Sequence, residues 1–291
     1  MTTAEGLVMG ADSMTVAGDS VIEKHYANAN KVFQILGLPI VVMTYGTGNL
    51  GRRSIGSLVD EWSQLRPAYE EQGYSVEQVA QDLGAFIFGK HREHRDLVRV
   101  AAEESQAKKI KGELEGEELT YKASDWTTGL IVGGYQPGSP YPWLYTWEEP
   151  EQPGVLEGLQ SARPHEGAHG EHGPAPGLDA WGDTGALDRL LDGIDPSLAG
   201  SLVHAGLLTV DEPFQAIAAP SQWDILYEGM PIQDAADLTR FVLQVAVGFE
   251  RFRAGNPRIG GDLDIAIVTR KIVHWYDRKP LTTALAPRVV G

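Results

Sequence analysis

The order of hydrophobic patterns in this 291-residue sequence predicts an α+β fold with two antiparallel sheets and helices on their outer faces. The chain begins with strand-like segments, continues with two amphipathic helical segments, and then returns to strand-like segments. Another helix and a last pair of strand-like segments complete the sequence. Because strands and helices come in groups and do not alternate one by one, a parallel sheet of βαβ units is not expected.

The first strands form a short meander. Residues 7–12 (LVMGAD) are an apolar run closed by polar residues, which is the pattern of a buried strand. Residues 31–36 (KVFQIL) alternate between polar and apolar positions, and residues 40–45 (IVVMTY) are rich in strand-forming residues. Gly37 and Pro39 mark the turn between these two strands.

Two helices are expected after the meander. In residues 54–65 the apolar side chains recur at steps of three and four, and Ser54 is a candidate N-cap. A second helix begins after Ser75 and becomes densely charged from Lys90 to Arg99. Residues 102–124 are charged and poor in apolar side chains, which indicates a mobile connection or a poorly packed insertion.

The second half repeats the strand–helix–strand order. The strongest helical pattern of the chain covers residues 232–253 and ends before Gly255, Asn256 and Pro257. Shorter helices are expected over residues 184–193 and 197–208. The remaining strands are predicted at residues 127–135, 141–147, 263–268 and 272–276. We therefore predict one domain over residues 1–291, with a charged insertion near 100–124 and a long Gly/Pro/His loop near 148–180.

The composition excludes several classes of protein. The chain has 40 acidic and 24 basic residues and a formal net charge of −16, so nucleic-acid phosphates and anionic membrane surfaces would repel it. It has no cysteine, which excludes disulfides and cysteine-ligated zinc and fits a reducing compartment. A run of 18 apolar residues and a signal peptide are both absent. We predict a cytoplasmic protein that binds neither nucleic acid nor membrane.

No sequence pattern indicates a cofactor or a metal. Phosphate-binding loops, dinucleotide fingerprints and HExxH motifs are absent. The long loop contains His165, His169 and His172, whereas His91 and His94 fall on the polar side of a predicted helix. Solvated histidines are expected at both places, so we predict no cofactor.

Five segments resemble, in family order, the β-type subunits of the proteasome, and one of them is especially similar to bacterial proteasome-related proteins. They are residues 6–18 (GLVMGADSMTVAG), 30–35 (NKVFQI), 46–54 (GTGNLGRRS, the bacterial-type segment), 130–147 and 256–269 (NPRIGGDLDIAIVT). This family belongs to the amino-terminal-nucleophile (Ntn) hydrolases. The resemblance implies a four-layer αββα sandwich, hydrolysis of peptide or amide bonds, and self-association into rings or other oligomers.

The resemblance also implies catalytic residues. A terminal threonine hydroxyl is a weak nucleophile, and a free α-amine with a pKa of about 8 can serve as its base. Thr2 becomes such a residue once Met1 is removed. Asp12 matches the family aspartate that orients a lysine, Lys31 matches that lysine, and Gly48 matches the turn glycine whose N–H faces the oxyanion.

Each of these matches has a purely structural alternative. Asp12 before a serine is typical of an Asx turn, Gly48 fits any tight turn, and Lys31 fits an exposed lysine at a strand start, with Lys24 as a competitor. Thr184 lies where the family carries a supporting serine, and Asp183 before it is expected to cap the next helix.

The family pattern is incomplete near the C-terminus. Ile259 stands where the family has a serine before Gly260 and Gly261. Glu250 is a distant candidate for the aspartate that the family carries upstream of these glycines.

Counting residues places Thr2 at the wrong end of its strand. Gly6 matches the turn glycine of the family, and four residues from Thr2 to Glu5 precede it. The six steps from Gly6 to Asp12 span about 20 Å, which four residues cannot retrace. Three explanations remain: the true start lies upstream, the chain is a non-catalytic subunit, or the strand is short and Thr2 still acts.

The leading hypothesis is a proteasome-like threonine peptidase or amidohydrolase that acts on a peptide or amide substrate within an oligomer. The alternative is a structural or assembly subunit with the same fold and no turnover. A small-molecule amidohydrolase of the same superfamily is the third hypothesis.

Overall fold

The computed structural model describes residues 1–18, 23–113, 116, 118–121, 128–149, 163–164, 176–193, 196–207 and 223–279. The strands are β1 (Leu7–Ala11), β2 (Thr15–Gly18), β3 (Glu23–Tyr26), β4 (Val32–Gln34), β5 (Ile40–Gly46), β6 (Asn49–Leu50), β7 (Arg53–Ser54), β8 (Thr128–Gly134), β9 (Trp143–Glu149), β10 (Arg163–Pro164), β11 (Asp264–Val268) and β12 (Val273–Asp277). The helices are α1 (Ile55–Leu65), α2 (Tyr69–Gln72), α3 (Val76–Ile110), α4 (Gly185–Leu191), α5 (Pro196–His204) and α7 (Ile232–Phe252).

Two antiparallel sheets form the centre of the molecule. One has the strand order β1-β11-β12 and the other has the order β10-β9-β8-β5-β4. In the first sheet Leu7 pairs with Val268 and Ala11 pairs with Asp264. The small ribbons β2-β3 and β6-β7 lie outside these sheets. The predicted antiparallel sheets are thus confirmed.

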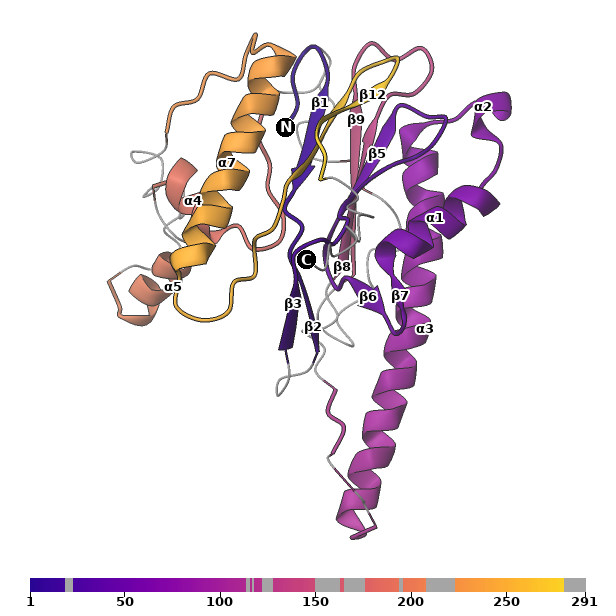
Figure 1. The fold of residues 1–291 in the computed structure, drawn as a ribbon, viewed down its shortest axis with the longest axis vertical. Coiled ribbons are helices and arrows are strands. Elements are labelled where there is room, and N and C mark those ends of the chain that lie inside the picture. The colour runs from indigo at the N-terminus through magenta and orange to yellow at the C-terminus, as the bar shows by residue number, and fades with distance from the viewer. Residues whose placement is uncertain are drawn as a thin grey trace, which may run out of the picture.

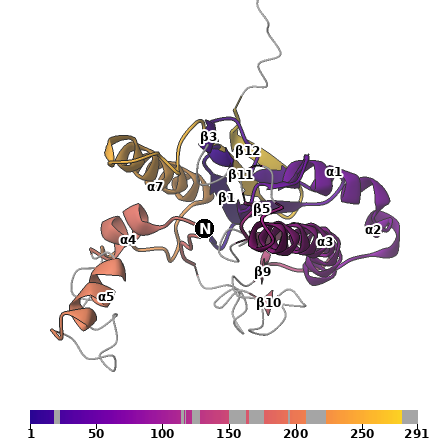
Figure 2. The ribbon, with the colours of Figure 1, turned by 90° about the horizontal axis from the view of Figure 1, so that it is seen from below.

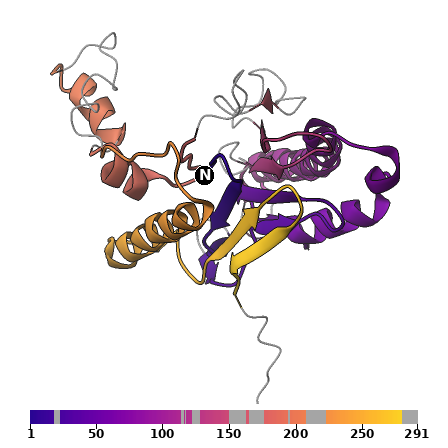
Figure 3. The same ribbon diagram turned by 90° about the horizontal axis from the view of Figure 1, so that it is seen from above.

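The hydrophobic clusters show a helix–sheet–sheet–helix order. Because neighbouring side chains of a strand point to opposite faces, Leu7 and Met9 of β1 pack toward the five-stranded sheet, where they meet Ile131 of β8. Val8 packs on the other face, against Ala235 of α7. The outer face of the five-stranded sheet packs on α1 and α3. Figures 1, 2 and 3 show α7 and α3 on opposite sides of the strands.

The N-cap expected at Ser54 is confirmed, and Ser75 caps the second predicted helix in the same way. Ser54 Oγ accepts the Ser57 N–H at 3.1 Å at the start of α1, and Ser75 Oγ accepts the Gln78 N–H at 3.0 Å at the start of α3. Each bond satisfies one of the N–H groups that a helix start leaves without a backbone partner.

Helix α3 is longer than predicted, and the expectation of a mobile connection fails for residues 102–110. The helix continues to Ile110 and projects beyond the rest of the molecule (Figure 1). Good helix formers and ion pairs along one face, such as Arg99 with Glu103 at 2.8 Å, support this charged half. Ser105 Oγ also accepts the N–H of Leu119 at 3.0 Å, which joins the returning chain to the helix.

Two further expectations concern the long loop and the membrane. Most of residues 148–180, including His165, His169 and His172, lie outside the described residues. Among the described helices, none combines the length and apolar character that crossing a bilayer would require.

Candidate functional site

Asp12 and Lys31 form an ion pair at the end of β1. The Lys31 Nζ lies 2.6 Å from Asp12 Oδ1 and donates a hydrogen bond to it. The two side chains are 23% and 12% exposed for Lys31 and Asp12, respectively, so the pair is partly shielded from water but remains accessible. Strand β1 carries Asp12 to this place, and Lys31 directly precedes β4. The structure thus brings together two residues that are 19 positions apart in sequence.

Backbone donors hold the second carboxylate oxygen of Asp12. The N–H of Met14 donates to Oδ2 at 3.0 Å, and the N–H of Gly260 donates to it at 2.9 Å. The Asx turn that the sequence allowed for Asp12 therefore coexists with the lysine contact. Three donors on one carboxylate fix its orientation.

Ser13 ties this end of β1 to the C-terminal segment. Its N–H donates to the Gly260 carbonyl at 3.1 Å, and its fully buried Oγ lies 2.8 Å from the carbonyl oxygen of Ala27 and 2.6 Å from that of Asp262. Gly260 therefore contacts both Asp12 and Ser13. Sequence reasoning missed this role, because no local pattern predicts a backbone contact across 248 residues.

The ion pair lies in a groove of about 2690 Å³. One wall is β1 from Leu7 to Asp12, another is the turn from Gly46 to Gly48, and a third is the segment from Leu178 to Thr184. Gly48 is close to Thr15, whose Oγ1 lies 2.8 Å from the place that a Cβ at position 48 would occupy. A side chain at position 48 would therefore have to displace that hydroxyl.

Thr184 lines the same groove, but Asp183 does not cap the following helix. Thr184 is itself the N-cap residue of α4, and its Oγ1 donates to Asp188 Oδ2 at 2.9 Å. The Asp183 carboxylate instead lies 3.9 Å from the Arg253 guanidinium. The prediction of an Asp183 cap is therefore wrong, because Thr184 occupies the N-cap position and no side chain caps the start of α4.

Thr2 lies in a tight hairpin away from Asp12. The Thr3 N–H donates to the Gly6 carbonyl at 2.9 Å, which closes a tight turn from Thr3 to Gly6. Thr2 forms bridges with Leu7 and Gly177 and is buried. The five steps from Leu7 to Asp12 span roughly 16 Å of strand. The structure therefore brings Asp12, Lys31, Gly48 and Thr184 to one groove and leaves Thr2 outside it.

The hairpin also buries the α-amine of Met1. This amine donates to the Val8 carbonyl at 2.7 Å, and the Met1 carbonyl accepts the Val8 N–H at 2.8 Å. Burial lowers the pKa of the amine to about 6, although the nearby Asp179 carboxylate acts in the opposite direction. Glu5 in the turn accepts the N–H of Ile232 at 2.9 Å and so holds the start of α7.

Glu250 and Ile259 of the C-terminal segment make their contacts away from the Asp12–Lys31 ion pair. Glu250 is buried and bonds to Arg253 at 2.8 Å and to the Arg258 N–H at 3.1 Å. Burial opposes its charged form, but these bonds outweigh that effect and lower the pKa of Glu250. Glu250 therefore holds the loop before Gly260, and Ile259 packs against the α4–α7 cluster.

Of the described histidines, His25 lines this groove, whereas His91 and His94 belong to α3. Lys24 lies on β3, outside the two central sheets. His91 is fully buried on α3, and the His94 ring lies over Gly51, so the expectation of a solvated His91 is wrong. Within the described part of the chain, no group of three or more histidine and acidic side chains is placed to hold a metal ion.

No protein-family model and no curated protein matches the sequence. The structure is similar to solved structures of Anbu, the ancestral beta-subunit. Anbu from Yersinia bercovieri is 15% identical with a TM-score of 0.48, and the match covers 96% of this chain and 86% of that one. Anbu from Hyphomicrobium sp. strain MC1 is 14% identical with a TM-score of 0.49 over the same shares of the two chains.

Proposed function

We propose that this protein is a proteasome-like hydrolase of peptide or amide bonds, with Asp12 and Lys31 at its catalytic centre. The observation that carries the proposal is the 2.6 Å contact between Lys31 and a carboxylate that two backbone N–H groups already fix. A lysine that only served solubility would not need a partner held in this way.

The proposed reaction is acyl transfer to a hydroxyl. The hydroxyl oxygen attacks the amide carbonyl while its proton passes to a neutral amine, and the resulting tetrahedral oxyanion needs nearby donors. Collapse releases the amine product, which takes that proton, and water then hydrolyses the ester. In this scheme the Lys31 ammonium stabilises negative charge on the attacking oxygen, Asp12 orients Lys31, and the Gly48 turn supplies N–H donors.

The groove suits an extended substrate. Its volume of about 2690 Å³ exceeds the 300–1,000 Å³ of pockets that enclose small ligands. Thr184 on the opposite wall is assigned a supporting role, because its hydroxyl is held by Asp188. The proposal includes self-association into a ring or another oligomer, as the resemblance in sequence implies.

A non-catalytic assembly subunit is the second candidate, and the position of Thr2 favours it. The Thr2 N–H donates to the Gly177 carbonyl at 2.9 Å, and Gly177 donates back at 3.2 Å. A nucleophile must lie within hydrogen-bond reach of its base and of the reacting carbonyl. Thr2 meets this condition only if the hairpin with β1 opens.

Hydrolysis assays on matched lysine variants separate the two candidates. Fluorogenic peptides and small aromatic amides are incubated with the wild type, with Lys31→Ala and with Lys108→Ala, an exposed lysine at the far end of α3. The hydrolase proposal predicts loss of at least about 100-fold in kcat/KM for Lys31→Ala and no loss for Lys108→Ala. Equal rates for all three proteins, with an unchanged oligomer in analytical ultracentrifugation, would contradict the hydrolase proposal and favour the assembly subunit.

A further inference from the structure

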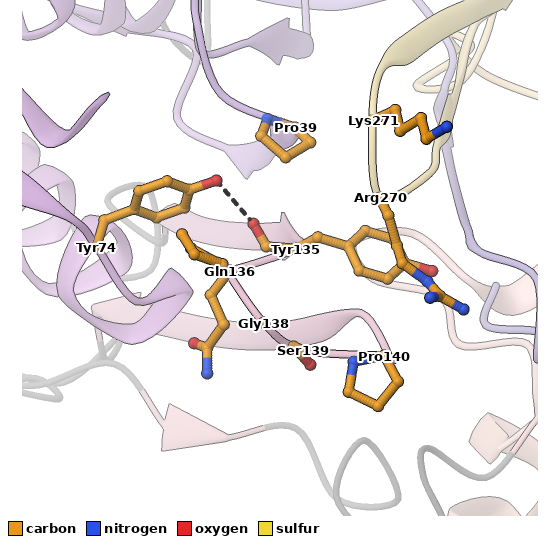
Figure 4. A pocket seen from close by; sticks show the side chains of 10 residues that line it. Pro39, Tyr74, Tyr135, Gln136, Gly138, Ser139, Pro140, Arg270 and Lys271 are labelled. Atoms are coloured by element: carbon orange, nitrogen blue, oxygen red, sulfur yellow. Dashed lines mark hydrogen bonds between the residues drawn. The ribbon is translucent and has the colours of Figure 1, made fainter. Parts of the chain in front are cut away.

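A second pocket lies at the other end of the molecule. It has a volume of about 450 Å³ and is bounded by Pro39, Pro137 and Pro140, by the rings of Tyr74 and Tyr135, and by the β11–β12 turn that carries Arg270 and Lys271 (Figure 4). This volume falls in the range of pockets that bind small molecules. The pocket is formed where both central sheets end, so neither sheet alone contains it.

The pocket is separate from the groove that holds Asp12. Strand β1 runs from Leu7 to Ala11 beside Val268 to Asp264 of β11, in antiparallel register. Arg270 follows the Val268 end, whereas Asp12 follows the Ala11 end. Seven residues of strand, roughly 20 Å, therefore separate the levels of the two sites.

Hydrogen bonds fix the walls of this pocket. The Tyr74 hydroxyl donates to the Tyr135 carbonyl at 3.0 Å, and the Tyr135 N–H donates to the Pro39 carbonyl at 3.0 Å. The Trp143 indole N–H donates to Ser139 Oγ at 3.0 Å, which holds the turn after β8. Walls that are already ordered lose little conformational entropy when a ligand binds.

One rim of the pocket carries two cations without a carboxylate partner. Within the described residues, neither Arg270 nor Lys271 takes part in an ion pair or a side-chain hydrogen bond. Other cations of this acidic chain are paired, as Lys279 is with Asp264 and Arg253 is with Glu250. Unpaired positive charge beside a pocket, in a chain of net charge −16, is suited to an anionic ligand.

Tyr135 packs under the pocket, and its hydroxyl is turned to the protein. The side chain is 2% exposed, and the hydroxyl donates to the Glu5 carbonyl at 3.5 Å. Burial raises the pKa of Tyr135, and the positive charge of Arg270 offsets only part of that effect, so the hydroxyl stays neutral at physiological pH. Arg270 and Lys271 are both exposed at the rim (Figure 4), so their charges can reach an anion in the pocket.

We propose that this pocket binds an organic carboxylate with a flat or aliphatic body. The guanidinium of Arg270 binds the carboxylate, since guanidinium groups match both of its oxygens. Lys271 adds a second positive charge. The proline rings and the Tyr74 ring cover the apolar body, which explains why the pocket combines three prolines with charge on only one rim.

The test compares a carboxylate with its neutral amide. Binding of N-acetylphenylalanine and of N-acetylphenylalaninamide is measured by saturation-transfer NMR and by isothermal titration, with the wild type and with the double variant R270Q/K271Q. The double variant K108Q/R251Q removes two exposed cations elsewhere and thus matches the change in net charge.

The proposal predicts that the acid binds and the amide binds at least about fivefold more weakly. R270Q/K271Q weakens binding of the acid about five- to tenfold, and K108Q/R251Q leaves it unchanged. Equal affinity for acid and amide, no binding of the acid, or equal losses in the two double variants would each overturn the proposal. Hydrolytic activity plays no part in these readings, so the outcome is independent of the function proposed for Asp12 and Lys31.

Discussion

Replacing Asp12 by asparagine tests how the carboxylate organises the end of β1. Asp12 accepts three hydrogen bonds: from Lys31 at 2.6 Å, from Gly260 at 2.9 Å and from Met14 at 3.0 Å. An asparagine has one acceptor oxygen and one donor group. If its oxygen faces the two backbone N–H groups, its amide NH₂ faces the Lys31 ammonium. In the reverse orientation the amide NH₂ faces both backbone N–H groups, so donors face donors.

The cost follows from the better of these two orientations. It loses one charge-assisted hydrogen bond and leaves Lys31, with a side chain only 23% exposed, without its anion. We expect Asp12→Asn to lower the free energy of unfolding by about 2 kcal/mol, since hydrogen bonds to charged groups contribute roughly 1.5–3 kcal/mol. Lys31→Met keeps both backbone bonds to Asp12, so its expected cost is smaller, about 1 kcal/mol.

Urea unfolding of both single variants and of the double variant measures this difference. The double-mutant cycle should give a coupling of about 1 kcal/mol between the two side chains, with an unchanged m-value. A larger cost for Lys31→Met than for Asp12→Asn, or a coupling near zero, would refute the view that Asp12 is the anchored partner.

Two further predictions concern stability. Gly84→Ala on α3 places a methyl group directly onto the Trp147 ring of β9, so it should destabilise the protein by about 1–3 kcal/mol in thermal unfolding. Gly89→Ala lies on the same helix, and its added methyl group would meet no atom within 4 Å, so it should stabilise the protein by up to about 1 kcal/mol. The opposite ranking would contradict the packing described for these elements. In protein that retains Met1, the unfolded chain binds more protons at the α-amine than the folded one between pH 6 and pH 8, because burial lowers the folded pKa from 8.0 to about 6. The free energy of unfolding should therefore rise with pH across this window by about 2–3 kcal/mol. The rise should be larger in Asp179→Asn, because the Asp179 carboxylate raises the pKa of the amine. Urea titrations at pH 6 and pH 8 that show no rise in either protein would contradict a buried amine.

Local signals account for the parts of the fold that the sequence predicted well. Serine residues and apolar steps of three and four mark the starts of α1 and α3, an apolar run marks β1, and alternation marks the segment that contains β4. The end of α3 at Ile110 was missed because the charged half has no apolar stripe and relies on pairs such as Arg99–Glu103. Apolar periodicity predicts helices that pack on a core, so it cannot predict the part of α3 that extends beyond the core.

The candidate site was predictable only in part. Asp12, Lys31 and Gly48 follow from the resemblance in sequence, and counting residues from Gly6 to Asp12 predicts that Thr2 lies too far away. The Gly260 N–H was not predictable, since backbone groups leave no trace in residue identity. The pocket around Tyr135 was missed for a related reason, because four separate segments of the chain form it.

The most direct test of the proposed function is covalent labelling with an electrophilic β-lactone, read by intact mass and by peptide mapping. The N-terminus of the protein is first established by mass, so that the terminal residue is known. The account predicts a single adduct on a hydroxyl residue in the wild type and in Lys108→Ala, and no adduct in Lys31→Ala. An unlabelled wild type, or equal labelling of Lys31→Ala, would contradict a catalytic role for the Asp12–Lys31 pair.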